Sequence, residues 1–308
     1  MRNGMRALSL AAASALAVAL IGPAAAAAAP GQAAHAGQPV HAGQATTDTF
    51  QRSDASTPPP IREDPAPLGA NDWDCEPTEE NPRPVILAHG FGAPAAGHFS
   101  AYSPYLSAKG HCVFTGTYGS VDLPVAGLLG GFKPIEHSAE QLSAFVDKVL
   151  EETGAEKVDI VGHSQGGVMP RYYLKNLGGT EKVDNFVAWA APNDGLTLSG
   201  LYTLAQKIPG FEEELLPRVC EVCSQLTNAT GFLDELNAGD PAPGDVDYTM
   251  VASRSDVLVT PYTTSFLEGD NVDNILMQEE YPGAIIGHIQ MAYDPRVWKV
   301  TDRALQHD

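Results

Sequence analysis

The feature that most restricts how this chain can fold is a turn containing two glycines. Residues 157–161 form a short, largely apolar run typical of a buried strand, and the sequence Gly-His-Ser-Gln-Gly follows at 162–166. Residues 167–177 then have helical spacing and end at two glycines. A strand can enter a helix this sharply only where the flanking positions lack a bulky Cβ, which explains Gly162 and Gly166. The turn therefore lifts the Ser164 hydroxyl clear of the sheet.

Strands and helices alternate over the rest of the chain. The hydrophobic pattern predicts strands at residues 85–88, 112–115, 157–161, 183–190 and 248–253. It predicts helices at residues 102–108, 135–150 and 167–177, and a terminal helix opened by Asp294-Pro295. This alternation indicates an α/β fold with a mostly parallel sheet covered by helices on both faces, and with its active site at the carboxyl ends of the strands.

The N-terminal part is expected to lie outside the folded domain. Residues 1–29 have a basic start, a short apolar run and an alanine-rich exit, which are typical of a secretory signal peptide and too short for a membrane anchor. Residues 30–70 contain almost no large apolar side chain, so we expect a disordered linker or pro-segment. Residues 71–308 then form the catalytic domain, and the protein is predicted to be secreted.

Charge and cysteine usage narrow the class of protein further. Asp and Glu number 38 against 18 Lys and Arg, a net charge of −20, which makes nucleic acid an unsuitable partner. Four cysteines in an exported chain are expected to form disulfides, and of three possible connectivities we favour Cys75–Cys112 with Cys220–Cys223. The Cys-x-x-Cys pair could instead be a redox motif or half a zinc site, but no second ligand pair accompanies it.

The strand–turn–helix setting makes Ser164 the candidate nucleophile, and a neutral hydroxyl needs a neighbouring base. In this type of site the partners follow the serine in the order acid, then histidine. Only His288 and His307 follow Ser164, and His307 lies next to the end of the sequence, where fraying is expected. His288, in an apolar stretch that ends in a Gly-His loop, is therefore the predicted base.

Two aspartates fit the position of the acid. Asp256 follows the strand predicted at 248–253, and Asp194 follows the strand predicted at 183–190. Both satisfy the required order, and we favour Asp256. The backbone N–H groups of Gln165, directly after the nucleophile, and of Phe91, in the loop after the first strand, are the predicted oxyanion-hole donors. The side chains of His89 and His163 are expected to hydrogen-bond to the backbone beneath the site.

Several segments together resemble the secreted bacterial α/β-hydrolase lipases of the lipase class 2 family. They are Pro-Val-Ile-Leu-Ala-His-Gly at 84–90, Val-Asp-Ile-Val-Gly-His-Ser-Gln-Gly-Gly at 158–167, Ser-Asp-Val-Leu-Val-Thr-Pro-Tyr at 255–262 and Gly287-His288. The resemblance implies an α/β-hydrolase fold and a triad of Ser164, Asp256 and His288. Phe91 stands where members commonly have a smaller residue, which implies a narrower acyl pocket.

The resemblance also implies the reaction, hydrolysis of carboxylic esters and most directly of triacylglycerols, without a cofactor. No metal is expected, since no ligand spacing selects one. The expected partner is an ester or lipid substrate, for which a lipid–water interface is one expected place of contact, and the chain is expected to be a monomer. An apolar segment at 121–132 could edge the pocket or pack as a loop, and an insertion at 196–236 could be a lid or a rigid cap. The alternatives are a short-chain esterase, polyesterase or acyltransferase with the same triad, and an exported binding protein without catalysis.

Overall fold

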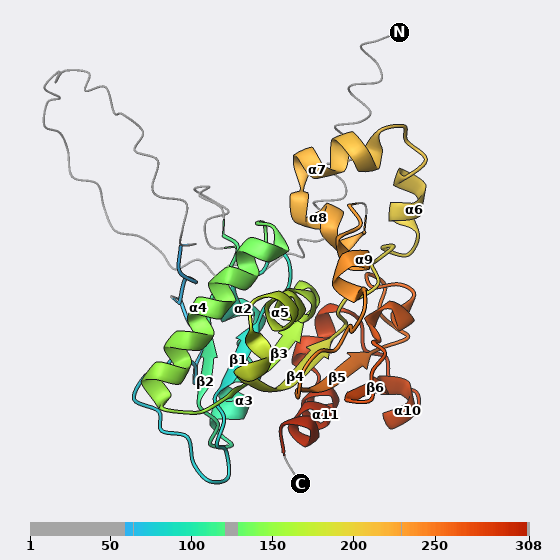
Figure 1. The fold of residues 1–308 in the computed structure, drawn as a ribbon. Helices are drawn as coiled ribbons and strands as arrows, with labels where there is room; N and C mark the ends of the chain where they lie inside the picture. Colours follow the sequence, from blue (N-terminus) through green and yellow to red (C-terminus); the bar gives the residue numbers. More distant parts are fainter. Residues whose placement is uncertain (1–58, 64, 121–128, 229, 307–308) are drawn as a thin grey trace, which may run out of the picture. The chain divides into compact units, whose positions relative to one another are not determined.

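A computed structural model describes residues 59–63, 65–120, 129–228 and 230–306, and these contain one parallel sheet (Figure 1). Its described strands lie in the order β2-β1-β3-β4-β5-β6, and each neighbouring pair is parallel. The strands are β1 Val85–Ala88, β2 Val113–Thr115, β3 Val158–His163, β4 Val183–Trp189, β5 Asp247–Ala252 and β6 Val272–Leu276. The expected parallel α/β sheet is confirmed, and β6 is a strand that the hydrophobic pattern did not predict.

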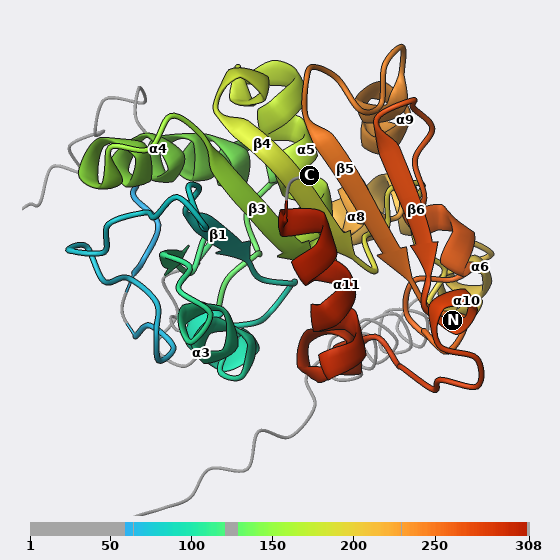
Figure 2. The same ribbon diagram turned by 90° about the horizontal axis from the view of Figure 1, so that it is seen from below.

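Helices cover both faces of this sheet, as continuous burial along strands whose side chains point to alternate faces requires (Figure 2). On β1, Ile86 and Ala88 join one core cluster, whereas Val85 and Leu87 join the other. The first cluster packs against α4 Ile135–Thr153 and α5 Gln165–Asn176, and the second packs against α3 Tyr102–Ser107 and α11 Pro295–Leu305. As predicted, Asp294 caps α11, and its side chain accepts a hydrogen bond from the Arg296 N–H at 2.9 Å. The central strands β3 and β4 are consequently buried on both sides.

The insertion between β4 and β5 is helical, and its two halves pack differently. The first half contains α6 Leu201–Ala205, the π-helix η2 Phe211–Leu215 and α7 Leu216–Val219, and the second contains α8 Glu221–Leu226 and α9 Phe232–Asn237. Buried residues of the first half form a small separate cluster, whereas those of α8 and α9 belong to the main core. The second half is therefore a fixed part of the domain. Motion of the first half stays a prediction.

The predicted domain boundary at residue 71 is wrong, because residues ahead of it are part of the packed structure. Ile61 is buried, and Arg62 and Thr117 exchange backbone hydrogen bonds of 3.1 and 2.7 Å. A Cβ on Gly116 would lie only 2.0 Å from Ile61, so the two segments approach as closely as glycine permits. The low apolar content of this region concealed a single anchoring isoleucine. The predicted signal peptide and the linker up to residue 58 lie outside the described residues.

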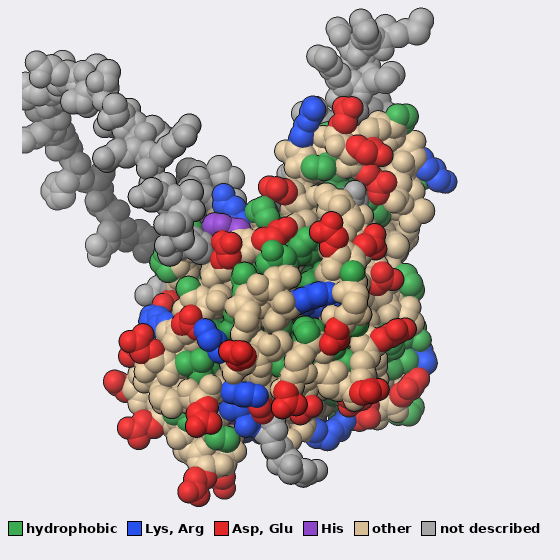
Figure 3. Space-filling model, viewed as in Figure 1, with side chains coloured by type: hydrophobic (Ala, Val, Ile, Leu, Met, Phe, Trp, Pro, Cys, Tyr) green, Lys and Arg blue, Asp and Glu red, His purple; other side chains and the backbone are tan. Residues whose placement is uncertain are grey.

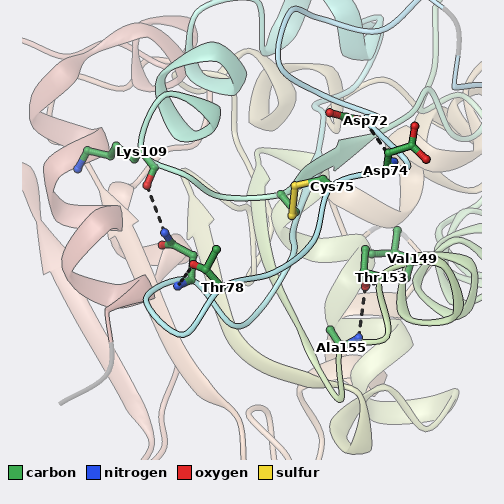
Figure 4. The surroundings of a disulfide bond; sticks show 10 residues. Asp72, Asp74, Cys75, Thr78, Lys109, Val149, Thr153 and Ala155 are labelled. Atoms are coloured by element: carbon green, nitrogen blue, oxygen red, sulfur yellow. Dashed lines mark hydrogen bonds between the residues drawn. A yellow bond between two sulfur atoms is a disulfide. The ribbon is translucent and has the colours of Figure 1, made fainter.

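Both predicted disulfides are present. Cys75–Cys112 has a Cα–Cα distance of 5.7 Å and ties the segment before β1 to the start of β2, and Cys220–Cys223 has one of 5.2 Å. Figure 4 shows the surroundings of Cys75, where the Asp74 N–H donates to the Asp72 carboxylate at 3.2 Å. The first disulfide thus closes a loop of long sequence separation against the sheet.

Acidic side chains are spread over the face seen in Figure 3, in keeping with the net charge of −20. Among the described residues, no helix combines the length and the apolar character needed to cross a bilayer.

Candidate active site

The predicted turn between β3 and α5 has the sharp geometry that its two glycines indicated. Ser164 at its tip has φ 57° and ψ −121°, a backbone conformation that L-residues rarely adopt. The Ser164 N–H donates to the Trp189 carbonyl at 2.8 Å, and its own carbonyl accepts from the Gly167 N–H at 2.8 Å. These bonds to β4 and α5 hold the strained residue in place.

The glycines on either side leave no room for a side chain. A Cβ on Gly162 would lie 1.8 Å from the Gly166 carbonyl oxygen, and one on Gly166 would lie 2.1 Å from the Ala88 carbonyl oxygen. Both obstacles are backbone atoms of buried elements, which cannot rotate away as a side chain can. The turn therefore exists only because both positions are glycine.

We expect Gly162→Ala to destabilise the fold by about 3 kcal/mol or more, because one methyl group forces apart the central strand and its helix. Urea unfolding followed by circular dichroism measures this loss. Gly97→Ala is the matched control, since its Cβ would lie 3.4 Å from Pro94, an ordinary contact. Equal unfolding midpoints for Gly162→Ala and wild type would contradict this account of the turn.

His288 and Asp256 are in direct contact. The Asp256 Oδ2 atom lies 2.7 Å from His288 Nδ1, and both residues are buried. The other carboxylate oxygen, Oδ1, accepts from the N–H groups of Leu258 at 2.8 Å and Val259 at 3.0 Å. A carboxylate can only accept, so Nδ1 carries the proton and Nε2 is left with its lone pair. This arrangement prepares His288 to act as a base through Nε2.

The structure brings Asp256, and not Asp194, to His288. Asp194 is exposed, and its N–H donates to the Thr264 carbonyl at 3.0 Å. His307, the other histidine that follows Ser164, lies outside the described residues. His288 itself lies in a loop directly before the 3-10 helix η4 Ile289–Tyr293.

His163, the residue before Ser164, links the serine turn to the histidine loop. Its Nε2 lies 3.0 Å from the His288 carbonyl oxygen, and the two imidazole rings are 4.7 Å apart between centroids. His89 lies deeper, where its Nδ1 donates to the Gly90 carbonyl at 2.8 Å and its Nε2 accepts from the Tyr118 N–H at 3.2 Å. Both histidines hydrogen-bond to backbone, as expected.

The two predicted oxyanion donors belong to neighbouring segments. Gln165 is the first residue of α5, where no preceding helical turn offers its N–H an acceptor. Phe91 lies in the loop after β1, and Gly131 separates it from Gln165. A Cβ on Gly131 would lie 2.5 Å from Gln165 Oε1 and 3.2 Å from Phe91 Cα. The Gln165 side chain and the Phe91 backbone therefore both lie against Gly131, and the role of their N–H groups as oxyanion donors stays a prediction.

A second glycine segment holds the Phe91 loop in position. The Gly92 N–H donates to the Gly130 carbonyl at 2.9 Å, and the Gly130 N–H donates to the Ala93 carbonyl at 3.2 Å. The Phe91 and Phe132 rings meet edge to face with centroids 5.0 Å apart. Of the apolar segment at 121–132, residues 121–128 lie outside the described residues, so both roles considered for it, pocket edge and packed loop, stay predictions.

His98 is a member of this group that the sequence pattern did not single out. It ends the short helix α2 Ala95–His98, and its ring lies 4.8 Å from the ring of His163. The rings of His288, His163 and His98 therefore follow one another in a row. Nothing in the spacing of the chain indicates this stack, because its members come from three separate segments.

We expect acid to destabilise the fold through these histidines. Burial lowers the pKa of His89 to about 4, and burial, followed by the charges of His89 and His288, lowers the pKa of His98 to about 3. The unfolded chain binds these protons near pH 6.5, so stability falls as the pH drops from about 6.5 towards 4. The loss is about 3 kcal/mol for His89 alone at pH 4. An unfolding midpoint in urea that stays constant between pH 7 and pH 4.5 would argue against it.

The sheet, the strained serine turn and the Asp–His pair at the carboxyl ends of its strands define an α/β-hydrolase. The family model for Lipase (class 2) matches residues 82–291, and the chain belongs to this family. Similar proteins include the triacylglycerol lipases of Pseudarthrobacter phenanthrenivorans and Burkholderia plantarii, each 34% identical over 97 residues, which are 29% of this chain. The matched region spans 27% and 24% of those two proteins, so about a quarter of their length is represented.

Solved structures agree on the fold. Aspergillus fumigatus lipase B has a TM-score of 0.57 and 19% identity, over 82% of this chain and 62% of that one. The mature form of Bacillus licheniformis lipase BlEst2 has a TM-score of 0.56 and 14% identity, over 75% of this chain and 95% of that one. At these identities the similarity establishes the architecture alone.

Proposed function

We propose that this protein is a serine carboxylic-ester hydrolase, specifically a triacylglycerol lipase, with Ser164 as nucleophile, His288 as base and Asp256 as the acid that orients it. The observation that carries the proposal is the 2.7 Å contact between Asp256 and His288, together with the bond from His163 to the main chain of His288. These contacts connect an acid and a base to the residue before the serine, although the three segments are far apart in sequence.

The mechanism follows from the groups present. Ser164 Oγ attacks the ester carbonyl carbon while its proton passes to His288 Nε2, and Asp256 stabilises the imidazolium that forms. The former carbonyl oxygen becomes negative and accepts hydrogen bonds from the N–H groups of Phe91 and Gln165. When the tetrahedral intermediate collapses, His288 gives its proton to the departing alcohol. Water then attacks the acyl-enzyme with the same base and releases the fatty acid.

Membership in the Lipase (class 2) family and the names of the two curated relatives support a triacylglycerol as substrate. The two disulfides support secretion, because such bonds form and persist in oxidising compartments. In this proposal residues 1–29 are a signal peptide removed on export. An N-terminal sequence of the protein from culture medium that still includes residues 1–29 would contradict this part.

Hydrolysis of p-nitrophenyl esters from acetate to palmitate, measured beside emulsified triolein, tests the substrate class. The proposal predicts turnover of the long-chain esters and release of oleate from triolein. Turnover confined to the short-chain esters would make the protein an esterase instead. A folded protein that hydrolyses none of these esters would contradict the proposed reaction.

A further inference from the structure

His163 occupies the last position of the central strand β3, one residue before the nucleophile, and its ring is directed at the loop that carries the base. Its Nε2 contacts the carbonyl oxygen of His288 at 3.0 Å across 125 positions of sequence. A carbonyl oxygen can only accept, so Nε2 carries the proton and donates it. The ring is therefore in the tautomer that leaves Nδ1 unprotonated.

Other contacts also hold the loop that this bond reaches: Ile286 is buried in the core, and the His288 carbonyl itself accepts from the Met291 N–H at 3.3 Å as well. Ile285 is 79% exposed, and the Ile286 carbonyl accepts from the Ser253 hydroxyl at 2.7 Å. The Gly287 N–H donates to the side chain of Gln290, which belongs to the same loop region. The bond from His163 is thus the contact between the His288 peptide and the strand that ends in the nucleophile.

The chemistry of His163 suits this position better than that of another donor. Burial, followed by the neighbouring His288 and His98, lowers the pKa of His163 well below its usual value, so the ring stays neutral. A lysine or arginine here would place a permanent cation beside His288 and oppose protonation of the base. Among the described residues, His163 Nδ1 is buried without a hydrogen-bond partner, an unfavourable feature that a purely structural apolar residue would avoid.

We infer that His163 is a positioning residue for the base: its Nε2–H holds the main chain of His288, so that the imidazole keeps its place between Asp256 and Ser164. The inference rests on the proposed function for the identity of the base. The small displacement that loss of this bond allows is costly, since a shift of about 1 Å in a catalytic group can lower a rate about 100-fold.

Substitution of His163 by glutamine or by asparagine distinguishes the effect of the hydrogen bond from the effect of side-chain size. The amide nitrogen of glutamine corresponds to Nε2 of histidine, whereas that of asparagine corresponds to Nδ1. We therefore expect His163→Gln to keep kcat within about threefold of wild type, and His163→Asn to lower kcat on the order of 10- to 100-fold with KM nearly unchanged. His137→Asn, on α4, makes the same chemical change away from the site and serves as the control. Equal losses in the two His163 variants, or none in either, would overturn the inference.

A spectroscopic measurement separates this inference from the proposed function, because it needs no turnover. The proton shared by His288 Nδ1 and Asp256 gives a downfield resonance in the proton NMR spectrum. We expect it to persist in wild type, His163→Gln and His137→Asn, and to broaden or shift in His163→Asn. A sharp, unmoved resonance in His163→Asn would contradict the positioning role. If the wild-type protein hydrolyses no ester but the resonance responds to the variants as expected, the result would count against the proposed function alone.

Discussion

Ser164→Ala is expected to lower ester hydrolysis by about 1,000-fold or more while the protein stays folded. Alanine removes the attacking oxygen but keeps the Cβ, so the strained turn at φ 57° costs the variant no more than it costs wild type. What activity remains would come from the oxyanion donors and substrate binding. Initial rates on p-nitrophenyl esters and unfolding midpoints, measured on both proteins, test the two halves of this expectation.

Ser100→Ala is the control for the loss of a hydroxyl. Ser100 is exposed, and its Oγ donates to the Gly97 carbonyl at 2.9 Å, in a segment that contributes no reacting group. We expect this variant to hydrolyse esters at the wild-type rate. Hydrolysis that survives in folded Ser164→Ala would remove Ser164 from the mechanism.

Asp256→Asn is the second large effect, a fall in kcat of roughly 10,000-fold with KM little changed. The amide introduced by this substitution has one oxygen, whereas Asp256 uses two: Oδ1 for the N–H groups of Leu258 and Val259, and Oδ2 for His288. If the remaining oxygen stays on the backbone, an NH₂ group faces His288 Nδ1. The imidazole must then accept at Nδ1 and carry its proton on Nε2, which is the wrong tautomer for a base.

Asp194→Asn tests the rival acid with the same substitution. Asp194 is exposed and contacts Thr264 through its backbone N–H, which the substitution leaves in place. We expect its kcat to be that of wild type. Steady-state kinetics on one long-chain ester decide between the two aspartates, and a larger loss in Asp194→Asn than in Asp256→Asn would reverse the assignment.

Much of the fold was predictable because its signals are local. The apolar runs that became β1, β3 and β4 are buried on both faces, and such strands need no partner to be recognised. Strand β6 was missed because two consecutive exposed polar residues, Asp273 and Asn274, interrupt its short apolar run, so its pairing with β5 is decided by the sheet. The start of the domain was placed too late because one buried side chain, Ile61, anchors a segment of otherwise polar composition.

The candidate site divides in the same way. The serine turn was predictable because its sharp bend excludes a Cβ at Gly162 and at Gly166, and both lie within one five-residue stretch. Chain order allowed both aspartates and the family resemblance favoured Asp256, but only the tertiary structure places Asp256 against His288. The contact from His163 to the His288 carbonyl joins a side chain to a backbone atom 125 residues away. Side-chain-to-backbone contacts of this kind leave no pattern in a single sequence.

Covalent labelling is the most direct test of the central claim, that Ser164 is the nucleophile activated by His288. The wild-type protein is treated with a long-chain alkyl phosphonate ester, and the modified peptide is mapped by mass spectrometry. We predict one phosphonyl group per chain, on Ser164, with hydrolysis lost in proportion to labelling and with much slower labelling in Asp256→Asn. Full loss of hydrolysis with the adduct on another residue, or an active protein that is never labelled at Ser164, would contradict the account.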